Sequence, residues 1–299
     1  MSNLFPHLHE KATSLMGLTE KERIFNARKQ IWIGYPAAKS ILAKLDDLFE
    51  YPKSDRMPNL LIQGRTNNGK TMLARRFYNF HPPDDNPDGE TAKSPVVYVQ
   101  APSIPDEGQL VDSILYFLNA PFRPTDKFSA KSKQLKVLLT AVDTRILIID
   151  EIHNMLAGGH KKQSAYLNYI KGLGNDMQIS IVCIGTKLAD RALVSDDQMS
   201  NRFDPAYLPR WQLDKNFLSL LASFEKLIPL AKPSNLCDPN IVSKVLSMSE
   251  GYLGEISRIL TTAAVLAIRS GTEKIDQRIL NKMDWTVPSM RRKRPEIGD

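Results

Sequence analysis

The sequence predicts an α/β protein in which a parallel sheet flanked by helices is followed by a small C-terminal helical lid domain. Two observations carry this prediction. Short apolar strands alternate with helical stretches over residues 56–212, which is typical of a parallel sheet covered on both faces. From about residue 213 onward, apolar residues recur only at helical spacing. With 299 residues, the chain is long enough for both parts.

Each element follows from a local pattern. Apolar runs predict strands at residues 59–63, 96–100, 145–149, 179–185 and 207–211. Helical spacing predicts helices between them at residues 71–78, 107–118, 134–141 and 163–172. Residues 79–94, rich in Pro, Asp and Gly, are expected to form a loop. Four further helices are expected at residues 215–228, 239–249, 255–269 and 276–283, and Asp214 and Asp238 stand where N-caps would.

These elements group into four segments. We expect a helical N-terminal segment (residues 1–55), an α/β core (56–212), a helical lid (213–290) and a basic tail (291–299). The tail contains RRKR, which could bind nucleic acid or a protein, or only keep the chain soluble.

Composition limits the possible classes of protein. A net charge of +7 is compatible with a polyanionic partner, but many ordinary enzymes are equally basic. Two cysteines cannot build a disulfide framework, and neither has metal-ligand spacing. The N-terminus lacks the pattern of a signal peptide, and no apolar run is long enough to span a bilayer. We therefore expect a soluble cytoplasmic protein with no membrane partner.

The strongest motif is GRTNNGKT at residues 64–71, which matches the P-loop pattern GxxxxGK[ST]. Gly64 and Gly69 let the backbone wrap so that its amides point at phosphates. Lys70 neutralises the β- and γ-phosphate oxygens, and the Thr71 hydroxyl coordinates Mg²⁺. The remaining loop positions expected around the phosphates are Arg65, Thr66, Asn67 and Asn68. The motif lies between a strand and a helix, as this chemistry requires, and predicts binding of ATP with Mg²⁺.

A second motif, ILIIDE at residues 146–151, supplies two carboxylates. An apolar strand that ends in Asp150 places this residue at the carboxyl edge of the sheet, where it can hold Mg²⁺. Glu151 then stands where a general base would polarise the attacking water. This pair favours ATP hydrolysis over binding alone.

Three other residues are candidates with an ordinary alternative each. Arg202 precedes the last strand, where an arginine finger would project into a neighbouring subunit, or it is a surface arginine. Arg258 begins a helix of the lid and could sense the γ-phosphate, or it belongs to a solvated helix face. Thr186 could contact the γ-phosphate or the attacking water, or only cap the next helix.

Together these segments resemble the AAA+ ATPases of the TniB/TnsC transposition regulators. The resemblance runs from about residue 20 to 285, and GxxNNGKT with DEIHN is its most specific part. The matching segments, in family order, are WIGYP (32–36), NLLIQGRTNNGKT (59–71), LIIDEIHN (147–154), CIGTKLADRAL (183–193), SNRF (200–203) with LPRW (208–211), and GYLGEISRIL (251–260).

The resemblance implies an ATP-dependent regulator of DNA transposition in bacteria. Such proteins assemble on double-stranded DNA as a homo-oligomeric ring or filament and link a target-selection protein to a transposase. It also implies that Arg202 is the arginine finger, that Arg258 is sensor 2, and that Trp32 or Tyr35 packs against adenine. Thr186 departs from the asparagine that is usual at sensor 1, so hydrolysis is expected to be slow.

The resemblance further implies DNA contacts from loops of the core. The candidates are Ser103, after the second strand, and a basic link that carries Arg123, Lys127, Lys131 and Lys133. The stretch GGHKK at residues 158–162 is another exposed basic loop. Each could instead be an ordinary solvated loop. No base-reading module stands out, so DNA binding is expected to be sequence-independent and sensitive to salt.

Three alternatives remain open. A helicase loader or replication initiator would share the core and the lid. A P-loop kinase would pass phosphate to a small molecule, although the Asp150–Glu151 pair and the helical second domain argue against it. A nucleotide-gated scaffold would turn over ATP only incidentally.

Overall fold

The computed structural model describes residues 4–89, 91–189 and 202–291. The chain divides into two compact units, of which one is Ala37–Pro209. The other joins Met1–Pro36 to Arg210–Asp299, so the N-terminal helices share a unit with the C-terminal ones. The sequence had instead grouped residues 1–55 as one segment. Each unit is described by itself below.

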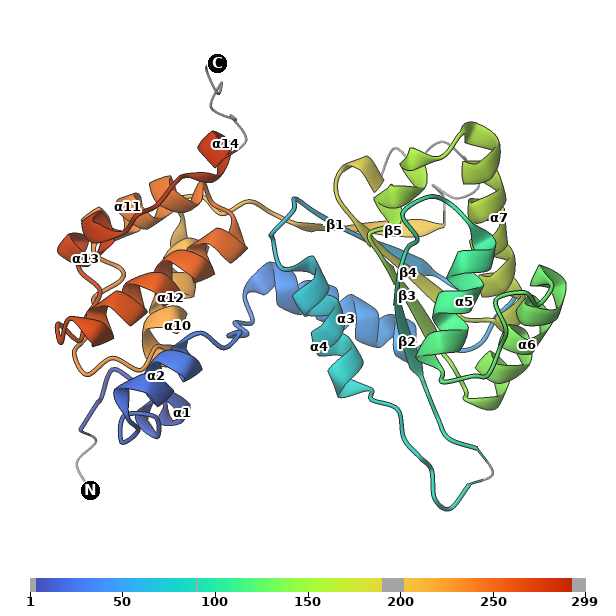
Figure 1. The fold of residues 1–299 in the computed structure, drawn as a ribbon, viewed down its shortest axis with the longest axis horizontal. Helices are drawn as coiled ribbons and strands as arrows, with labels where there is room; N and C mark the ends of the chain where they lie inside the picture. Colours follow the sequence, from blue (N-terminus) through green and yellow to red (C-terminus); the bar gives the residue numbers. More distant parts are fainter. Residues whose placement is uncertain (1–3, 90, 190–201, 292–299) are drawn as a thin grey trace. The chain divides into compact units, whose positions relative to one another are not determined.

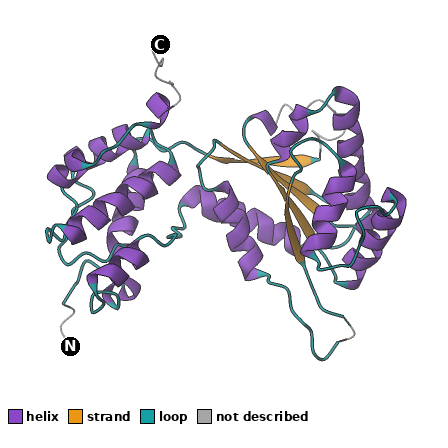
Figure 2. Cartoon of the chain, in the orientation of Figure 1, coloured by secondary structure: helices purple, strands orange, loops and turns teal. Residues whose placement is uncertain are grey.

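The α/β unit is built on a parallel sheet with strand order β2-β3-β4-β1-β5 (Figures 1 and 2). Its strands are β1 (Asn59–Gly64), β2 (Val96–Gln100), β3 (Ile146–Asp150), β4 (Ser180–Gly185) and β5 (Phe203–Leu208). Strands β1 to β4 lie where the apolar runs predict them. Because all strands are parallel, their carboxyl ends meet at one edge, and the segments that follow β1, β3 and β4 start there.

The last strand lies four residues earlier than the sequence predicts, at Phe203–Leu208 instead of 207–211. The sequence pattern does not predict a strand at Asp204 and Pro205, because both residue types are depleted in strands. The strand is at the edge of the sheet, where a proline without an N–H is tolerated. Its three buried residues, Phe203, Ala206 and Leu208, face the core.

Helices cover both faces of this sheet. Figure 1 shows α3 and α4 on one face and α5, α6 and α7 on the other. The helical segments of the unit are α3 (Pro36–Glu50), α4 (Lys70–Phe80), α5 (Glu107–Phe117), α6 (Phe128–Ala141), the 3-10 helix η1 (Ile152–Ala157) and α7 (His160–Met177). Successive residues of a strand point to opposite faces of the sheet and pack with the helices on each face. For example, Leu147 and Ile149 pack with α5, α6 and α7.

Two basic segments that the sequence predicts as loops are partly helical. Helix α6 begins at Phe128 with Lys127 as its N-cap, whereas the pattern predicts a start at residue 134. Helix α7 begins at His160, so Lys161 and Lys162 lie in its first turn. Helical periodicity is recognised from the spacing of apolar residues. In these lysine-rich segments the spacing does not show which charged residues are buried, so the helices were not predicted there.

The second unit is a helical bundle with its own apolar core. Its helices are α1 (Glu10–Thr13), α2 (Glu20–Ala27), α10 (Lys215–Leu227), α11 (Pro239–Ser249), α12 (Leu253–Arg269), α13 (Gln277–Lys282) and α14 (Pro288–Arg291). The two predicted N-caps are confirmed. Asp214 accepts from the backbone N–H of Phe217, and Asp238 accepts from that of Asn240.

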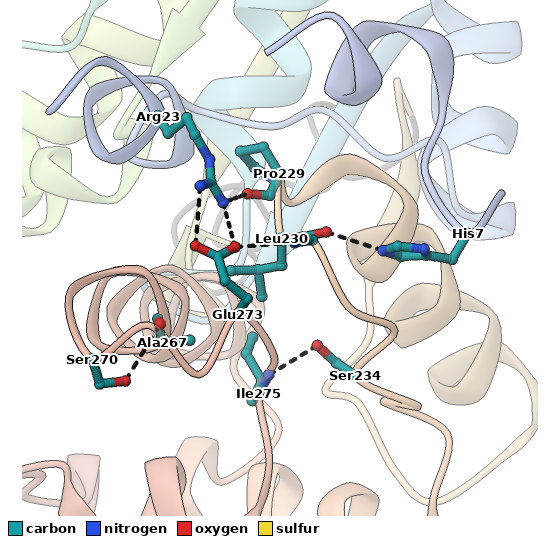
Figure 3. A network of polar contacts seen from close by, with 10 residues as sticks. His7, Arg23, Pro229, Leu230, Ser234, Ala267, Ser270, Glu273 and Ile275 are labelled. Atoms are coloured by element: carbon teal, nitrogen blue, oxygen red, sulfur yellow. Dashed lines mark hydrogen bonds and ion pairs between the residues drawn. The ribbon is translucent and has the colours of Figure 1, made fainter. Parts of the chain in front are cut away.

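Polar contacts attach the N-terminal helices to the rest of this bundle (Figure 3). Arg23 of α2 forms a two-pronged ion pair with Glu273 and also donates to the carbonyl of Pro229. The ring of His7 lies 3.0 Å from the carbonyl of Leu230. Among the helices that the structure describes, none is both long and apolar enough to cross a membrane.

Candidate nucleotide-binding site

The P-loop joins β1 to α4, as predicted. Gly69 caps the helix with φ 83°, a left-handed conformation that suits glycine. A Cβ on Gly64 would lie 3.2 Å from the Cβ of Leu208, so a larger residue there would push against β5. Arg65, Thr66 and Asn67 form the exposed tip of the loop. The loop therefore has the close-packed base and open tip expected of a phosphate cradle.

Lys70 is buried within this loop. Its Nζ donates to the carbonyl of Arg65 at 3.0 Å, so the ammonium lies inside the loop. Burial lowers the pKa of Lys70, while Glu151 and Asp150 oppose that shift through their negative charge. A buried ammonium is stabilised when an anion arrives, and phosphate oxygens would supply that charge.

Thr71, at the start of α4, and Asp150, at the end of β3, meet at the carboxyl edge of the sheet. They do so although β4 lies between β3 and β1, the strand that precedes α4. The Thr71 hydroxyl donates to Asp150 Oδ2 at 2.8 Å. A hydroxyl and a carboxylate are oxygen ligands of the kind that Mg²⁺ prefers alongside phosphate oxygens. The residues present therefore fit a magnesium nucleotide.

The same carboxylate has further partners that the sequence did not reveal. The hydroxyl of Tyr98, on β2, donates to Asp150 Oδ2 at 2.7 Å. Burial and the contact with Asp150 raise the pKa of Tyr98, so it stays a neutral donor. A single tyrosine in an apolar strand carries no motif, and only the fold shows where its hydroxyl points.

Glu151 has a left-handed backbone, with φ 57°. A residue other than glycine adopts this region at a cost, and it does so mainly where the surrounding structure requires it. Its backbone N–H donates to Asp150 Oδ1 at 2.8 Å, and its carboxylate lies 3.2 Å from His153 Nε2. About a third of the Glu151 side chain is exposed. The carboxylate is thus partly open to water and lies directly after Asp150, the predicted magnesium ligand.

The side chain of Asn68 is buried and links the P-loop to the end of β5. Its amide group donates to the carbonyls of Leu208 at 2.9 Å and Pro209 at 3.0 Å. That Asn68 contacts the nucleotide stays a prediction, which its backbone N–H could meet.

Thr186 and Arg202 lie at opposite ends of the sheet. Thr186 directly follows β4 at the P-loop edge, and its hydroxyl accepts from the backbone N–H of Leu188 at 3.4 Å. Arg202 directly precedes β5, whose first residue pairs with the first residue of β1. Its guanidinium donates to Asn175 of α7 at 2.8 Å. Arg202 therefore stands at the edge of the sheet opposite to its own P-loop.

Two of the residues predicted from the second unit, Arg258 and Tyr35, contact aromatic rings of that unit. Arg258 is an exposed residue of α12, and its guanidinium lies over the ring of Trp285 at 5.2 Å. The ring of Tyr35, one of the two residues expected near adenine, packs edge-on against Trp211 at 5.0 Å.

The predicted DNA-contacting residues separate into two groups. Ser103, Arg123 and Lys127 are exposed, as a phosphate contact requires. Lys131 is instead buried in α6, where it pairs with Asp112 at 2.6 Å and lies over the ring of Phe122. Lys131 is therefore removed from the set of DNA contacts. Residues 292–294 of the basic tail lie outside the described residues.

Comparison with known proteins identifies the family of the chain. A family model described as the bacterial TniB protein matches residues 23–213, which is more than half of the chain. A search of curated proteins by sequence found no match.

Several solved structures share the fold at low sequence identity. The Cdc6p protein of Pyrobaculum aerophilum is 17% identical, with a TM-score of 0.59, covering 86% of this chain and 68% of its own. The ORC2 protein of Aeropyrum pernix, in ADPNP-ADP complexes, is 16% identical, with a TM-score of 0.60 and coverages of 87% and 70%. The ORC1 protein of the same organism, in complex with DNA, is 15% identical, with a TM-score of 0.59 and coverages of 86% and 67%. These likenesses show a fold of the AAA+ kind.

Proposed function

Because the chain belongs to the TniB family, we propose that it is an ATP-hydrolysing regulator of DNA transposition. In this proposal ATP promotes assembly on duplex DNA as a ring or filament, and the assembly links a target-selection protein to the transposase. The observation that carries the ATP-dependent part is the closure of the P-loop onto the β3 carboxylate, through Thr71 and Asp150.

The roles of the site residues follow from their chemistry. Lys70 would neutralise the phosphates from inside the loop, and the loop amides would hold their oxygens. Thr71 and Asp150 would hold Mg²⁺, which when bound supplies charge for the phosphate oxygens. Glu151 would take a proton from the attacking water, since its carboxylate is partly exposed beside Asp150.

The position of Arg202 supports a site that is shared between subunits. Strands β1 and β5 pair in parallel register from Asn59 with Phe203 to Gly64 with Leu208. These five steps span about 16 Å at roughly 3.3 Å per residue. An arginine before β5 is thus at least that far from the P-loop of its own chain. If Arg202 stabilises the transferred phosphoryl group, it acts on the nucleotide of a neighbouring subunit.

The DNA-binding part of the proposal is supported by charge and by the family. The chain carries a net charge of +7, and Arg123 and Lys127 present exposed basic side chains. The Aeropyrum pernix ORC1 structure of the same fold contains DNA. Contacts to phosphates would give an affinity that falls steeply with salt and depends little on sequence.

Substitution of Glu151 with glutamine tests the catalytic assignment. Glu151→Gln removes the base but keeps the size of the side chain, so ATP binding should persist while turnover falls by about 10²- to 10⁴-fold. The variant should also remain on DNA after ATP addition, because release would depend on hydrolysis. Turnover can be measured by phosphate release, and wild-type turnover in the variant would contradict the assignment.

Electron microscopy of the protein with duplex DNA and a non-hydrolysable ATP analogue tests the assembly. Rings or filaments around DNA are expected, and dispersed monomers would contradict the proposal. Pull-down with a transposase against a replicative helicase distinguishes the regulator from a helicase loader. Phosphate found on an added acceptor, instead of free in solution, would indicate a kinase.

A further inference from the structure

The carboxylate of Asp150 accepts hydrogen bonds from three donors. Its Oδ1 accepts the backbone N–H of Glu151 at 2.8 Å. Its Oδ2 accepts the Thr71 hydroxyl at 2.8 Å and the Tyr98 hydroxyl at 2.7 Å. Two hydroxyl groups from two different elements, α4 and β2, therefore converge on one oxygen of the predicted magnesium ligand.

We infer that Tyr98 is a positioning residue that orients the Asp150 carboxylate toward Mg²⁺. The inference rests on the proposed function and deepens it, because Tyr98 belongs to neither of the two nucleotide-binding motifs. Tyr98 does not touch the nucleotide in this role. It acts by fixing the orientation of the ligand that does the binding, in the way outer-sphere hydrogen bonds tune metal sites.

The backbone contacts show that the Tyr98 hydroxyl is not needed to hold Asp150 in the sheet. Gln100 of β2 is the register partner of Asp150, and the Asp150 carbonyl accepts the N–H of Ala101 at 2.7 Å. The ladder therefore fixes the main chain by itself. What remains to be fixed is the side chain, and the Tyr98 hydroxyl contacts only that part.

Replacement of Tyr98 with phenylalanine tests the inference, because it removes only the hydroxyl. A suitable control is Tyr166→Phe, since Tyr166 is a buried tyrosine of the same unit whose hydroxyl forms no hydrogen bond with the described residues. Binding of a fluorescent ATP analogue would be titrated with Mg²⁺ for the wild type and both variants. Binding of the same analogue in EDTA measures the metal-free affinity. Thermal unfolding shows whether each variant is folded.

For Tyr98→Phe we expect the Mg²⁺ concentration at half-saturation to rise by roughly five- to tenfold, as loss of a hydrogen bond to a charged group predicts. Metal-free ATP affinity should stay within about twofold of the wild type, and the melting temperature within a few degrees. Tyr166→Phe should match the wild type in its Mg²⁺ dependence.

The outcomes separate this inference from the proposed function. A folded Tyr98→Phe protein with an unchanged Mg²⁺ half-saturation overturns the role of Tyr98 and leaves the proposed function standing. A wild-type protein without magnesium-dependent ATP binding overturns the proposed function, and the role of Tyr98 with it. An equal shift in Tyr166→Phe also overturns the inference, because any lost buried hydroxyl would then have the same effect.

Discussion

Lys131 shows that a lysine in a basic stretch can have a structural role. Its side chain is 7% exposed, and its ammonium lies 2.6 Å from a carboxylate oxygen of Asp112. Two residues further along α6, Lys133 is exposed to solvent. The sequence presents the two lysines alike, but the fold gives them opposite surroundings.

A matched pair of substitutions should distinguish these surroundings. Lys131→Met leaves the partly buried Asp112 without its cation and should lower the free energy of unfolding by about 2 kcal/mol, less than for a fully buried pair because Asp112 is 31% exposed. Lys133→Met should change it by less than about 0.5 kcal/mol. Urea unfolding measures both values. Equal effects of the two substitutions would contradict the assignment of Lys131 to the core.

At the scale of elements, the sequence predicted β1 to β4 correctly, placed β5 wrongly and put the starts of α6 and α7 too late. Strands β1, β3 and β4 are buried along almost their whole length, so their composition alone reveals them. Strand β5, at the edge of the sheet, has only three buried residues, and its exposed ones include Pro205. The first turn of α6 buries a lysine, and periodicity that counts only apolar residues misses it.

The candidate site was predictable to the extent that its residues belong to motifs. Thr71 and Asp150 were assigned to one metal ion from two distant segments, and the fold brings them to 2.8 Å. Tyr98 and the amide contacts of Asn68 were not predictable. Their contacts join residues far apart in the chain, and no spacing rule connects a side chain in one strand to a carboxylate in the next.

The attachment of α2 to the helical bundle provides a pH-dependent prediction. Burial by itself would raise the pKa of Glu273, but hydrogen bonds from Arg23 and from the backbone N–H of Ala231 outweigh it and lower that pKa. The ionised form is thus favoured in the folded state. The resulting stability is present above the ordinary glutamate pKa and is lost as the pH falls through the lowered value.

Accordingly, Glu273→Gln should destabilise the protein by about 2 kcal/mol at neutral pH. Its deficit relative to the wild type should shrink as the pH falls from about 5 to 3, because the wild type then loses the same ion pair. Chemical unfolding followed by circular dichroism at several pH values measures this difference. Glu20→Gln, on the exposed side of α2, serves as the control. A deficit that is constant with pH would contradict the prediction.

At the scale of the whole molecule, the shared site predicts complementation between two inactive variants. Arg202→Ala keeps Glu151 but lacks the arginine, whereas Glu151→Gln keeps the arginine but lacks the base. Each protein alone should hydrolyse ATP at a small fraction of the wild-type rate. In a random equimolar assembly about a quarter of the interfaces combine both intact groups, so about a quarter of the wild-type turnover should return.

Phosphate release from the mixture, with DNA present, measures this recovery. A suitable control is Arg202→Ala mixed with a protein that carries both Arg202→Ala and Glu151→Gln, because no interface in that mixture contains an arginine at position 202. If the mixture is as inactive as its components, Arg202 does not act across an interface.

The parallel register of β1 and β5 has a consequence for the ends of such an assembly. Since the P-loop and Arg202 occupy opposite edges of one sheet, subunits that complete each other's sites must stack head to tail, which gives the assembly a direction. A closed ring would leave no site incomplete. An open filament would have one terminal subunit that holds ATP without a neighbour's arginine, and one whose arginine meets no nucleotide. The first terminus would keep its ATP longest, so filament growth and loss would differ between the two termini.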